Sequence, residues 1–181
     1  MMSKTVCILS TSPRKGGNSD RLADAFLRGA ADAGHNAEKI CLHDKTLSFC
    51  KGCLACQKTH RCVIRDDMDA ILGKMRTADV LVFATPIYYY GMCGQMKTLL
   101  DRANPLYGTA YAFREIYLLA TAADTEDSAA DGAASGLSGW ISCFPNARLS
   151  GTVFAGGVDA VGAIAGHPAL ESAYAVGNHI V

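Results

Sequence analysis

Residues 10–19 (STSPRKGGNS) combine hydroxyls, an amide, a guanidinium and two glycines, which is the chemistry of an anion-binding turn. They follow a short apolar run at residues 6–9 and precede a segment with the hydrophobic spacing of a helix. The first N–H groups of a helix have no partner within the helix, and together with the helix dipole they favour an anion at such a turn. Neither the Walker A pattern nor the G-x-G-x-x-G fingerprint is present here. The same residue types cap ordinary helices, so the stretch alone supports a phosphate site and a simple cap equally.

Four of the eight cysteines lie close together, with the spacing C-x2-C-x2-C-x5-C. They are Cys50, Cys53, Cys56 and Cys62. Ferredoxins use the same compact opening for an iron–sulfur cluster, whereas zinc sites more often have two separate C-x2-C knuckles. Three interpretations stay open at this point: a [4Fe–4S] cluster, zinc, or thiols without a metal. We expect the remaining cysteines to act as small buried hydrophobes, namely Cys7, Cys41, Cys93 and Cys143.

The composition is that of a globular chain with a sizeable core. Of 181 residues, 50% are hydrophobic and 19% charged, with a formal net charge of zero, which predicts a single domain over residues 1–181. The charge balance gives no attraction for nucleic acid or an anionic membrane, and no apolar run approaches the roughly 18 residues of a membrane span. A secretory signal pattern is missing, so we expect a reduced, cytoplasmic setting in which clustered cysteines serve metal or redox chemistry.

Alternating apolar runs and amphipathic segments predict a repeated strand–helix order. We expect strands at residues 5–10, 37–42, 80–84, 115–120 and 148–154. We expect helices at residues 19–33, 68–77, 95–103, 128–144 and 168–177. A polar, cysteine-rich insertion occupies residues 43–65. Asp66 and Asp67 directly precede a helix, so we interpret them as its cap.

This order of elements predicts a parallel sheet covered on both faces. In such sheets, ligands bind beyond the carboxyl ends of the strands, where the strand order reverses. Residues 10–19, 85–92 and 121–127 all follow apolar strands, and all are polar or contain glycine. Five strands with an anion-binding turn after the first predict the flavodoxin-like order 2-1-3-4-5, with FMN as the ligand.

Four motifs, in order along the chain, resemble one known family. Residues 12–19 (SPRKGGNS), 50–56 (CKGCLAC), 62–68 (CVIRDDM) and 85–92 (TPIYYYGM) together resemble the flavodoxin-fold NADPH-dependent FMN reductases, and within them the iron–sulfur flavoprotein branch. The resemblance covers residues 4–105 well and only the general layout beyond them. It implies a three-layer α/β sandwich with a five-stranded parallel sheet. It also implies bound FMN, and assembly as a homodimer or tetramer with the flavin near a subunit contact.

The resemblance further implies which residues hold the cofactors. The FMN phosphate would be held by Ser10, Ser12, Arg14, Gly17, Asn18 and Ser19. The ribityl chain and the ring would contact Pro86, Ile87, Tyr88, Tyr89, Gly91 and Met92. The third loop adds Thr121 and Asp124, although it has no sharp motif. In the iron–sulfur branch, the metal ligands would be Cys50, Cys53, Cys56 and Cys62.

The function implied by the resemblance is that of an FMN-dependent oxidoreductase. It would use NAD(P)H as cosubstrate and pass a hydride or electrons through FMN to a small acceptor, such as a quinone, a nitro or azo compound, or free flavin. Because the cofactor carries this chemistry, we name no catalytic residue. One alternative is an iron–sulfur flavoprotein that receives electrons from ferredoxin through a [4Fe–4S] cluster. A second is a non-catalytic electron carrier or a thiol redox sensor.

Overall fold

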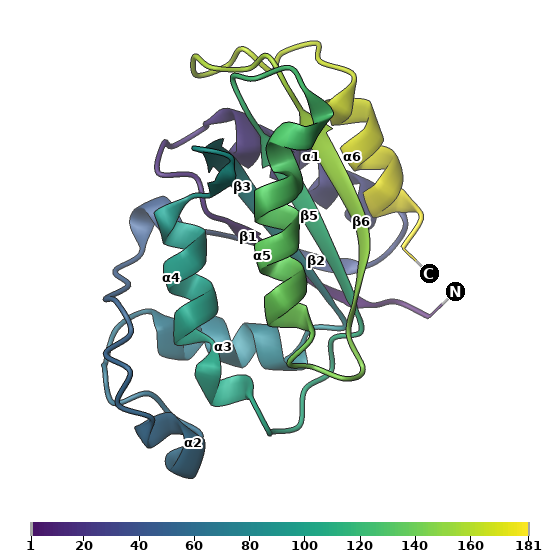
Figure 1. Cartoon of the computed structure of the whole chain (residues 1–181). Helices are drawn as coiled ribbons and strands as arrows, with labels where there is room; N and C mark the ends of the chain where they lie inside the picture. The colour runs from purple at the N-terminus through teal and green to yellow at the C-terminus, as the bar shows by residue number, and fades with distance from the viewer. Residues whose placement is uncertain (1, 181) are drawn as a thin grey trace.

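A computed structural model describes residues 2–180 as a three-layer α/β sandwich (Figure 1). One sheet forms the middle layer, and helices cover both of its faces. One face is covered by α1 (Asn18–Asp32) and α6 (Ala169–Asn178). The other face is covered by α3 (Met68–Thr77), α4 (Gly94–Arg102) and α5 (Asp131–Ile141). Among the described residues, none of the helices combines the length and the apolar character that crossing a bilayer requires.

Five strands of the sheet pair in parallel, in the order β2-β1-β3-β5-β6. They are β1 (Thr5–Ser10), β2 (Asn36–Cys41), β3 (Val80–Tyr88), β5 (Glu115–Thr121) and β6 (Arg148–Ala155). Numbered without the short β4, this is the flavodoxin-like order 2-1-3-4-5, so the predicted fold is confirmed. A sixth strand, β4 (Gly91–Met92), pairs antiparallel with the end of β3 and was not predicted.

The strands divide their side chains between two hydrophobic cores. Successive residues of a strand point to opposite faces of the sheet. In β1, Val6 and Ile8 lie in the core beneath α1 and α6, whereas Cys7 and Leu9 lie in the core beneath α3, α4 and α5. All four side chains are fully buried. A strand covered on both faces therefore has a continuous apolar sequence instead of an alternating one.

The structure extends β3 beyond its predicted end at residue 84. The strand continues through Thr85 and Pro86 to Tyr88, where the turn residues had predicted a loop. Proline lacks the N–H that a central strand must donate. Pairing with β1 ends at Ala84, so beyond that point β3 has β5 as its one parallel neighbour. A proline is tolerated there, because only one side of the strand is hydrogen-bonded to the sheet.

Two other predicted segments have more detailed structure than expected. The predicted helix 128–144 is a 3-10 turn (Asp127–Ala130) followed by α5. The cysteine-rich insertion, predicted as a loop, begins beside a 3-10 turn (Leu42–Asp44) and holds a short helix, α2 (Ala55–Thr59). A third 3-10 turn (Asn104–Leu106), which contains Pro105, follows α4.

A buried ion pair closes the base of the cysteine-rich insertion. Asp66, whose side chain is 5% exposed, accepts two hydrogen bonds of 2.8 Å from Arg102 of α4, whose side chain is 1% exposed. Arg102 also donates to the Ser48 carbonyl at 2.7 Å, and Asp66 accepts from the Ser48 N–H at 2.9 Å. Asp66 accepts from the Met68 N–H at 3.2 Å as well, so its predicted capping role is confirmed. Asp67 makes no such bond to the helix.

Glycines allow α1 and α6 to come into contact. A Cβ at Gly29 of α1 would collide with the Tyr174 carbonyl of α6, and a Cβ at Gly177 of α6 would collide with the Phe26 carbonyl of α1. At these two points the helix backbones touch, with no side chain between them. This contact holds α6, together with the loop that precedes it, against α1.

Candidate functional site

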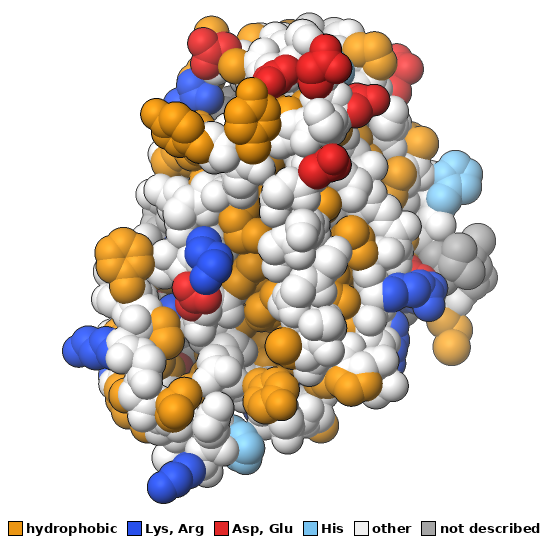
Figure 2. Space-filling view, viewed as in Figure 1, with side chains coloured by type: hydrophobic (Ala, Val, Ile, Leu, Met, Phe, Trp, Pro, Cys, Tyr) orange, Lys and Arg blue, Asp and Glu red, His pale blue; other side chains and the backbone are white. Residues whose placement is uncertain are grey.

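The three predicted ligand loops lie together at one edge of the sheet (Figure 1). β1 ends at Ser10 beside Ala84 of β3, and Pro86 of β3 pairs with Thr121 of β5. All three loops therefore start from neighbouring strands, at the carboxyl ends of those strands. Figure 2 shows that this edge bears both large hydrophobic side chains and a group of acidic ones.

Residues 10–19, which we call the phosphate turn, are held in shape by their own side chains. The buried Ser12 donates its hydroxyl to the Arg14 carbonyl at 2.9 Å and accepts from the Arg14 N–H at 3.2 Å. A Cβ at Gly17 would lie 2.6 Å from Ser12 Oγ, so a side chain here would displace the Ser12 hydroxyl from its hydrogen bonds. Gly16 has a φ of +64°, in the left-handed region that favours glycine. Ser12 and the two glycines therefore shape the turn.

The N-terminus of α1 meets this turn without a side-chain cap. Gly17 is the N-cap residue, and no side chain among residues 2–180 makes a capping hydrogen bond there. Ser19, in the first turn of α1, is 1% exposed, and its buried hydroxyl has no hydrogen-bond partner within the described residues. A buried hydroxyl without a partner costs about 1–3 kcal/mol, so a group from outside the chain is its natural partner. Free helix N–H groups and an unpartnered hydroxyl are donors suited to a phosphate.

Asn18 ties the phosphate turn to the loop after β6. Its amide nitrogen donates to the carbonyls of Val158 at 3.2 Å and Ala160 at 2.9 Å. Its amide oxygen accepts from the N–H groups of Gly162 at 3.1 Å and Ile164 at 3.3 Å. Both the nitrogen and the oxygen of the Asn18 amide are therefore hydrogen-bonded within the protein. The loop after β6 forms a wall of the site that the sequence did not predict.

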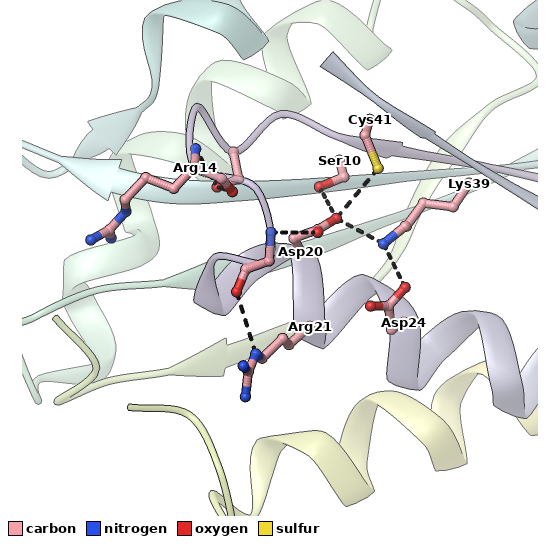
Figure 3. Close-up of polar contacts among 9 residues, drawn as sticks. Ser10, Arg14, Asp20, Arg21, Asp24, Lys39 and Cys41 are labelled. Atoms are coloured by element: carbon pink, nitrogen blue, oxygen red, sulfur yellow. Dashed lines mark hydrogen bonds and ion pairs between the residues drawn. The ribbon is translucent and has the colours of Figure 1, made fainter. Parts of the chain in front are cut away.

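Arg14 and Ser10 lie on different sides of the phosphate turn (Figure 3). Arg14 is exposed, and its guanidinium donates to the Asp159 carbonyl at 3.1 Å, so it is available at the surface of the turn. Ser10 is fully buried and donates its hydroxyl to Asp20 at 2.8 Å. Asp20 was missed by the sequence reasoning, since an acidic residue in the first turn of a helix is common for other reasons.

The second ligand loop is a tight hairpin between β3 and β4. Tyr88 pairs with Gly91, and the two residues between them, Tyr89 and Tyr90, have φ values of +49° and +61°. Two consecutive positive φ angles match a type I′ turn, which glycine and asparagine normally occupy. Left-handed backbone costs an ordinary residue about 1–2 kcal/mol, and such strain gathers at functional sites. The Tyr89 side chain at the tip is fully exposed.

A hollow of about 210 Å³ lies between this hairpin and the third loop. It is lined by Ile87, Tyr89, Tyr90, Ala122, Ala123, Asp124 and Ala129. The Tyr90 hydroxyl donates to Asp124 at 3.1 Å and so joins the two loops. The Glu126 N–H and the Tyr90 hydroxyl both bond to Asp124 and lower the pKa of its carboxyl. Apolar walls with a polar rim suit a flat, largely apolar ring.

The other predicted ring contacts surround this hollow without all lining it. Met92 is half-buried and pairs with Ile87 across the hairpin, and Tyr88 is partly exposed beside it. Pro86 and Thr121 are buried and paired with each other in the sheet. The structure therefore brings Ile87 and the third loop together, and leaves Pro86 and Thr121 in the sheet behind them.

A buried thiol connects the phosphate turn to the hairpin. Cys93, the N-cap residue of α4, lies with its sulfur 3.2 Å from the Thr11 hydroxyl. The Cys93 N–H donates to the Thr85 hydroxyl at 3.1 Å. The Thr11 hydroxyl in turn donates to the Ala84 carbonyl at 2.8 Å. Both loops are therefore held to one buried hydrogen-bonded group.

The four clustered cysteines do not converge on one point. Within residues 2–180, no three Cys, His, Asp or Glu side chains are grouped as ligands for a metal ion. Cys56 accepts a hydrogen bond from the Asn104 amide at 3.0 Å, and Cys50 accepts one from the Gly52 N–H at 3.4 Å. All eight cysteines of the chain are free thiols. In this arrangement the four side chains do not fit an iron–sulfur cluster or zinc.

The other cysteines follow their prediction only in part. Cys7 and Cys93 are buried, as expected of small hydrophobes, and Cys41 is half-buried. Cys143 is exposed, so its prediction is wrong. The physical reason is that α5 ends at Ile141, two residues before Cys143, so this thiol lies outside the apolar stripe of the helix.

A parallel sheet of order 2-1-3-4-5, with an anion-binding turn after its first strand, defines the flavodoxin-like class of proteins. The chain belongs to the NADPH-dependent FMN reductase family, whose sequence profile matches residues 4–155. The family predicted from the four motifs is therefore confirmed. The matching family is one of enzymes, described as NADPH-dependent FMN reductases, which agrees with the predicted class of protein.

Comparison with individual proteins gives two kinds of similarity. Iron–sulfur flavoproteins of Archaeoglobus fulgidus and Methanocaldococcus jannaschii are 40% identical over 102 residues and 42% identical over 98 residues. These matches cover 56% and 54% of this chain but only 46% and 51% of those proteins, so the chain spans about half the length of the curated relatives it matches. The solved structure of an NAD(P)H:quinone oxidoreductase from Methanothermobacter marburgensis has a TM-score of 0.77 at 19% identity, over 98% of this chain and 96% of that one. It shares the fold.

Proposed function

We propose that the protein is an FMN-dependent oxidoreductase that uses NAD(P)H to reduce a small acceptor, such as a quinone, a nitro or azo compound, or free flavin. The observation that carries the proposal is the phosphate turn. This turn combines an uncapped helix N-terminus, the buried hydroxyl of Ser19 without a partner in the described residues, and the exposed Arg14. This donor set fits a phosphate monoester, because charge-assisted hydrogen bonds from a guanidinium and from helix N–H groups suit its oxygens.

The predicted phosphate residues would then have two roles. Arg14 and Ser19 would bind the phosphate directly, since the Ser19 hydroxyl has no partner within the described residues and the Arg14 guanidinium has N–H donors besides the one bonded to the Asp159 carbonyl. Ser10, Asn18, Ser12 and Gly17 would keep the turn in shape, since the polar side chains among them already have partners within the protein. This division supports a turn that is formed before its ligand arrives.

The ring would occupy the hollow between the hairpin and the third loop. Ile87, Tyr89 and Asp124 line this hollow, and Tyr88, Gly91 and Met92 hold the hairpin beside it. Pro86 and Thr121 would support it from the sheet. When bound, FMN supplies the hydride and electron chemistry, and the chain binds and orients it, so we assign no catalytic side chain. The exposed tyrosines at the hairpin tip support assembly as a homodimer or tetramer, in which they would be covered.

The test is a titration of the purified protein, freed of flavin, with FMN and with riboflavin. We expect one FMN per chain, a flavin absorption spectrum, and clearly tighter binding of FMN than of riboflavin, because only FMN carries the phosphate. The loaded protein should then oxidise NAD(P)H in the presence of a quinone. Protein that binds no FMN, or that binds both flavins equally well, would refute the proposed phosphate site.

A second candidate is an iron–sulfur flavoprotein that takes electrons from ferredoxin. The names of the two relatives and the spacing of Cys50, Cys53, Cys56 and Cys62 favour it. Cluster binding would require this insertion to rearrange, since its thiols do not converge as they stand. Iron and sulfide assays on anaerobically purified and reconstituted protein decide between the two. Less than about one iron per chain excludes a four-cysteine cubane.

A further inference from the structure

A buried ion network lies directly beneath the phosphate turn (Figure 3). Its centre is Asp20, in the first turn of α1, whose side chain is only 8% exposed. One carboxylate oxygen accepts from the Ser10 hydroxyl and from the Lys39 ammonium, both at 2.8 Å. The other carboxylate oxygen accepts from the Gly16 N–H at 3.2 Å. Asp20 therefore reaches from the helix into the turn and binds its backbone.

Side chains of α1 form hydrogen bonds with both backbone polar groups of Gly16. Asp20 takes its N–H, while the Arg21 guanidinium donates to its carbonyl at 3.3 Å. Gly16 has a positive φ and an open space where a Cβ would be, so its own packing does not fix it. The two flanking side chains therefore fix this part of the phosphate turn in the absence of any ligand.

Lys39 is the cation that accompanies Asp20. It comes from β2, at the position opposite Ile8 of β1, and its side chain is 15% exposed. It also forms an ion pair with Asp24, one turn further along α1. Burial by itself would raise the pKa of Asp20 and lower the pKa of Lys39, but their mutual hydrogen bond moves both pKa values the other way. Both groups are therefore charged near neutral pH.

This pairing has a consequence for an anionic ligand. A carboxylate just below the turn repels a phosphate above it, because like charges in a partly buried site are poorly screened. Asp20 nevertheless holds the turn in shape, since it bonds to Gly16 and Ser10. The ammonium of Lys39 removes most of the repulsion while leaving both of these hydrogen bonds in place.

We propose that Asp20 holds the phosphate turn in shape while Lys39 neutralises the Asp20 charge, and we call this pair the tether. Lys39 is then a positioning residue that gives the site its preference for a phosphorylated flavin over an unphosphorylated one. The proposal rests on the proposed function, because it requires a phosphate to occupy the turn. It assigns a role to a side chain that lies on a neighbouring strand and acts on the turn through Asp20.

The main variant is Lys39→Met, tested by titration with FMN and with riboflavin. We expect FMN affinity to fall at least tenfold, because the Asp20 charge is left uncompensated beneath the phosphate. Riboflavin affinity should stay within about twofold, since riboflavin has no phosphate to repel. A merely structural role would weaken both flavins together, and that result overturns the proposal. Lys39→Arg keeps the charge and should keep the preference for FMN.

The second variant combines Lys39→Met with Asp20→Asn. Removing both charges removes the repulsion, while the asparagine oxygen can still accept from the Gly16 N–H and its amide nitrogen can donate to the Ser10 hydroxyl. We therefore expect FMN affinity to recover to within about threefold of the unchanged protein. Absence of recovery overturns the charge argument. This double variant also replaces a buried charged pair by neutral groups, so it keeps the test usable where Lys39→Met alone folds poorly.

Lys74→Met is the matched control. Lys74 pairs with Glu38, the neighbour of Lys39 on β2, at 3.1 Å, but both side chains are exposed. The change removes one positive charge beside β2, but on the opposite face of the sheet from α1, so it does not touch the phosphate turn and should leave both flavin affinities unchanged. If the unchanged protein itself does not prefer FMN, the proposed function fails. If it does prefer FMN and Lys39→Met keeps the same ratio, only the tether fails.

Discussion

Ser10 and Ser19 both bury a hydroxyl at the phosphate turn, but within the part of the chain that the structure describes only Ser10 has a hydrogen-bond partner for it. We predict that Ser19→Ala lowers FMN affinity about tenfold or more, because a hydrogen bond to a charged group is worth about 1.5–3 kcal/mol. The same change should leave the flavin-free protein as stable as before, or more stable by up to about 1 kcal/mol, because an unpartnered buried hydroxyl is removed. Flavin titration and denaturant unfolding of the flavin-free protein measure the two effects.

The matched control is Ser172→Ala, in α6, whose exposed hydroxyl donates to the Pro168 carbonyl at 3.4 Å. It makes the same chemical change in a helix outside the turn and should leave FMN affinity unaltered. A Ser19→Ala protein that loses stability while keeping its FMN affinity contradicts the assignment, because the hydroxyl would then have a partner within the chain.

At this scale, the sequence predicted which residues gather at the turn, but not what each side chain does there. Ser12, Gly17 and Arg14 could be proposed from their types alone, because turn chemistry is local. Asn18 bonds to a carbonyl 140 positions away, and Lys39 reaches Asp20 from the neighbouring strand. No short-range pattern encodes such partners, so these roles became visible only in the folded chain.

At the scale of elements, α5 packs directly against the hairpin that borders the hollow lined by Ile87, Tyr89 and Asp124. A Cβ at Gly132 of α5 would collide with the Tyr90 carbonyl. We predict that Gly132→Ala displaces the hairpin, destabilises the protein by about 1–3 kcal/mol and weakens binding of FMN and riboflavin alike, because overpacking forces the backbone to move. Unfolding curves and titrations with both flavins provide the measurement.

Gly139→Ala is the control on the same helix, since nothing lies within 4 Å of the Cβ it would add. Alanine is about 1 kcal/mol better than glycine inside a helix, so this variant should be more stable and bind flavin normally. If Gly132→Ala also proves stabilising, α5 and the hairpin are not in the close contact described here.

Elements with a clear hydrophobic pattern were predicted closely, and the hairpin was not. β1 and α3 have their predicted bounds, because a continuous apolar run defines the strand and the helical spacing of apolar residues defines the helix. β4 is two residues long, and the turn before it is made by Tyr89 and Tyr90. A sequence reading relies on glycine, asparagine or aspartate to mark such a turn, and none of them occupies those two positions.

At the scale of the whole molecule, the strand order follows from general rules of parallel sheets, but the packing of the cysteine-rich insertion does not. Parallel strands joined by helices have few allowed topologies, so the order 2-1-3-4-5 could be predicted. The insertion is held by a contact between Asp66 and Arg102, 36 positions apart. The sequence assigned Asp66 only to a helix cap, because nothing in its neighbourhood indicates a buried arginine.

The Asp66–Arg102 pair makes the free energy of unfolding of the whole molecule depend on pH. Arg102 holds the pKa of Asp66 at about 2, below its ordinary value of 3.8. A carboxyl with a lower pKa in the folded chain than in the unfolded chain stabilises the fold above its unfolded pKa, and that stabilisation is lost as the pH falls through the folded pKa. We therefore predict that Asp66→Asn costs about 3–5 kcal/mol at neutral pH, because Arg102 stays buried without its counter-charge. The stability difference between the two proteins should then shrink as the pH falls from about 4 to about 2.

Two further variants separate the buried pair from charge effects in general. Asp69→Asn breaks the exposed pair with Arg65, whose side chain is 65% exposed, and should cost less than about 0.5 kcal/mol at any pH. Asp66→Asn combined with Arg102→Met removes both buried charges and should recover much of the loss, because no unpaired charge is left inside. Denaturant unfolding across this pH range measures all four proteins. A stability difference for Asp66→Asn that stays constant with pH would mean that the loss comes from packing, and that the carboxylate charge of Asp66 does not hold the insertion to α4.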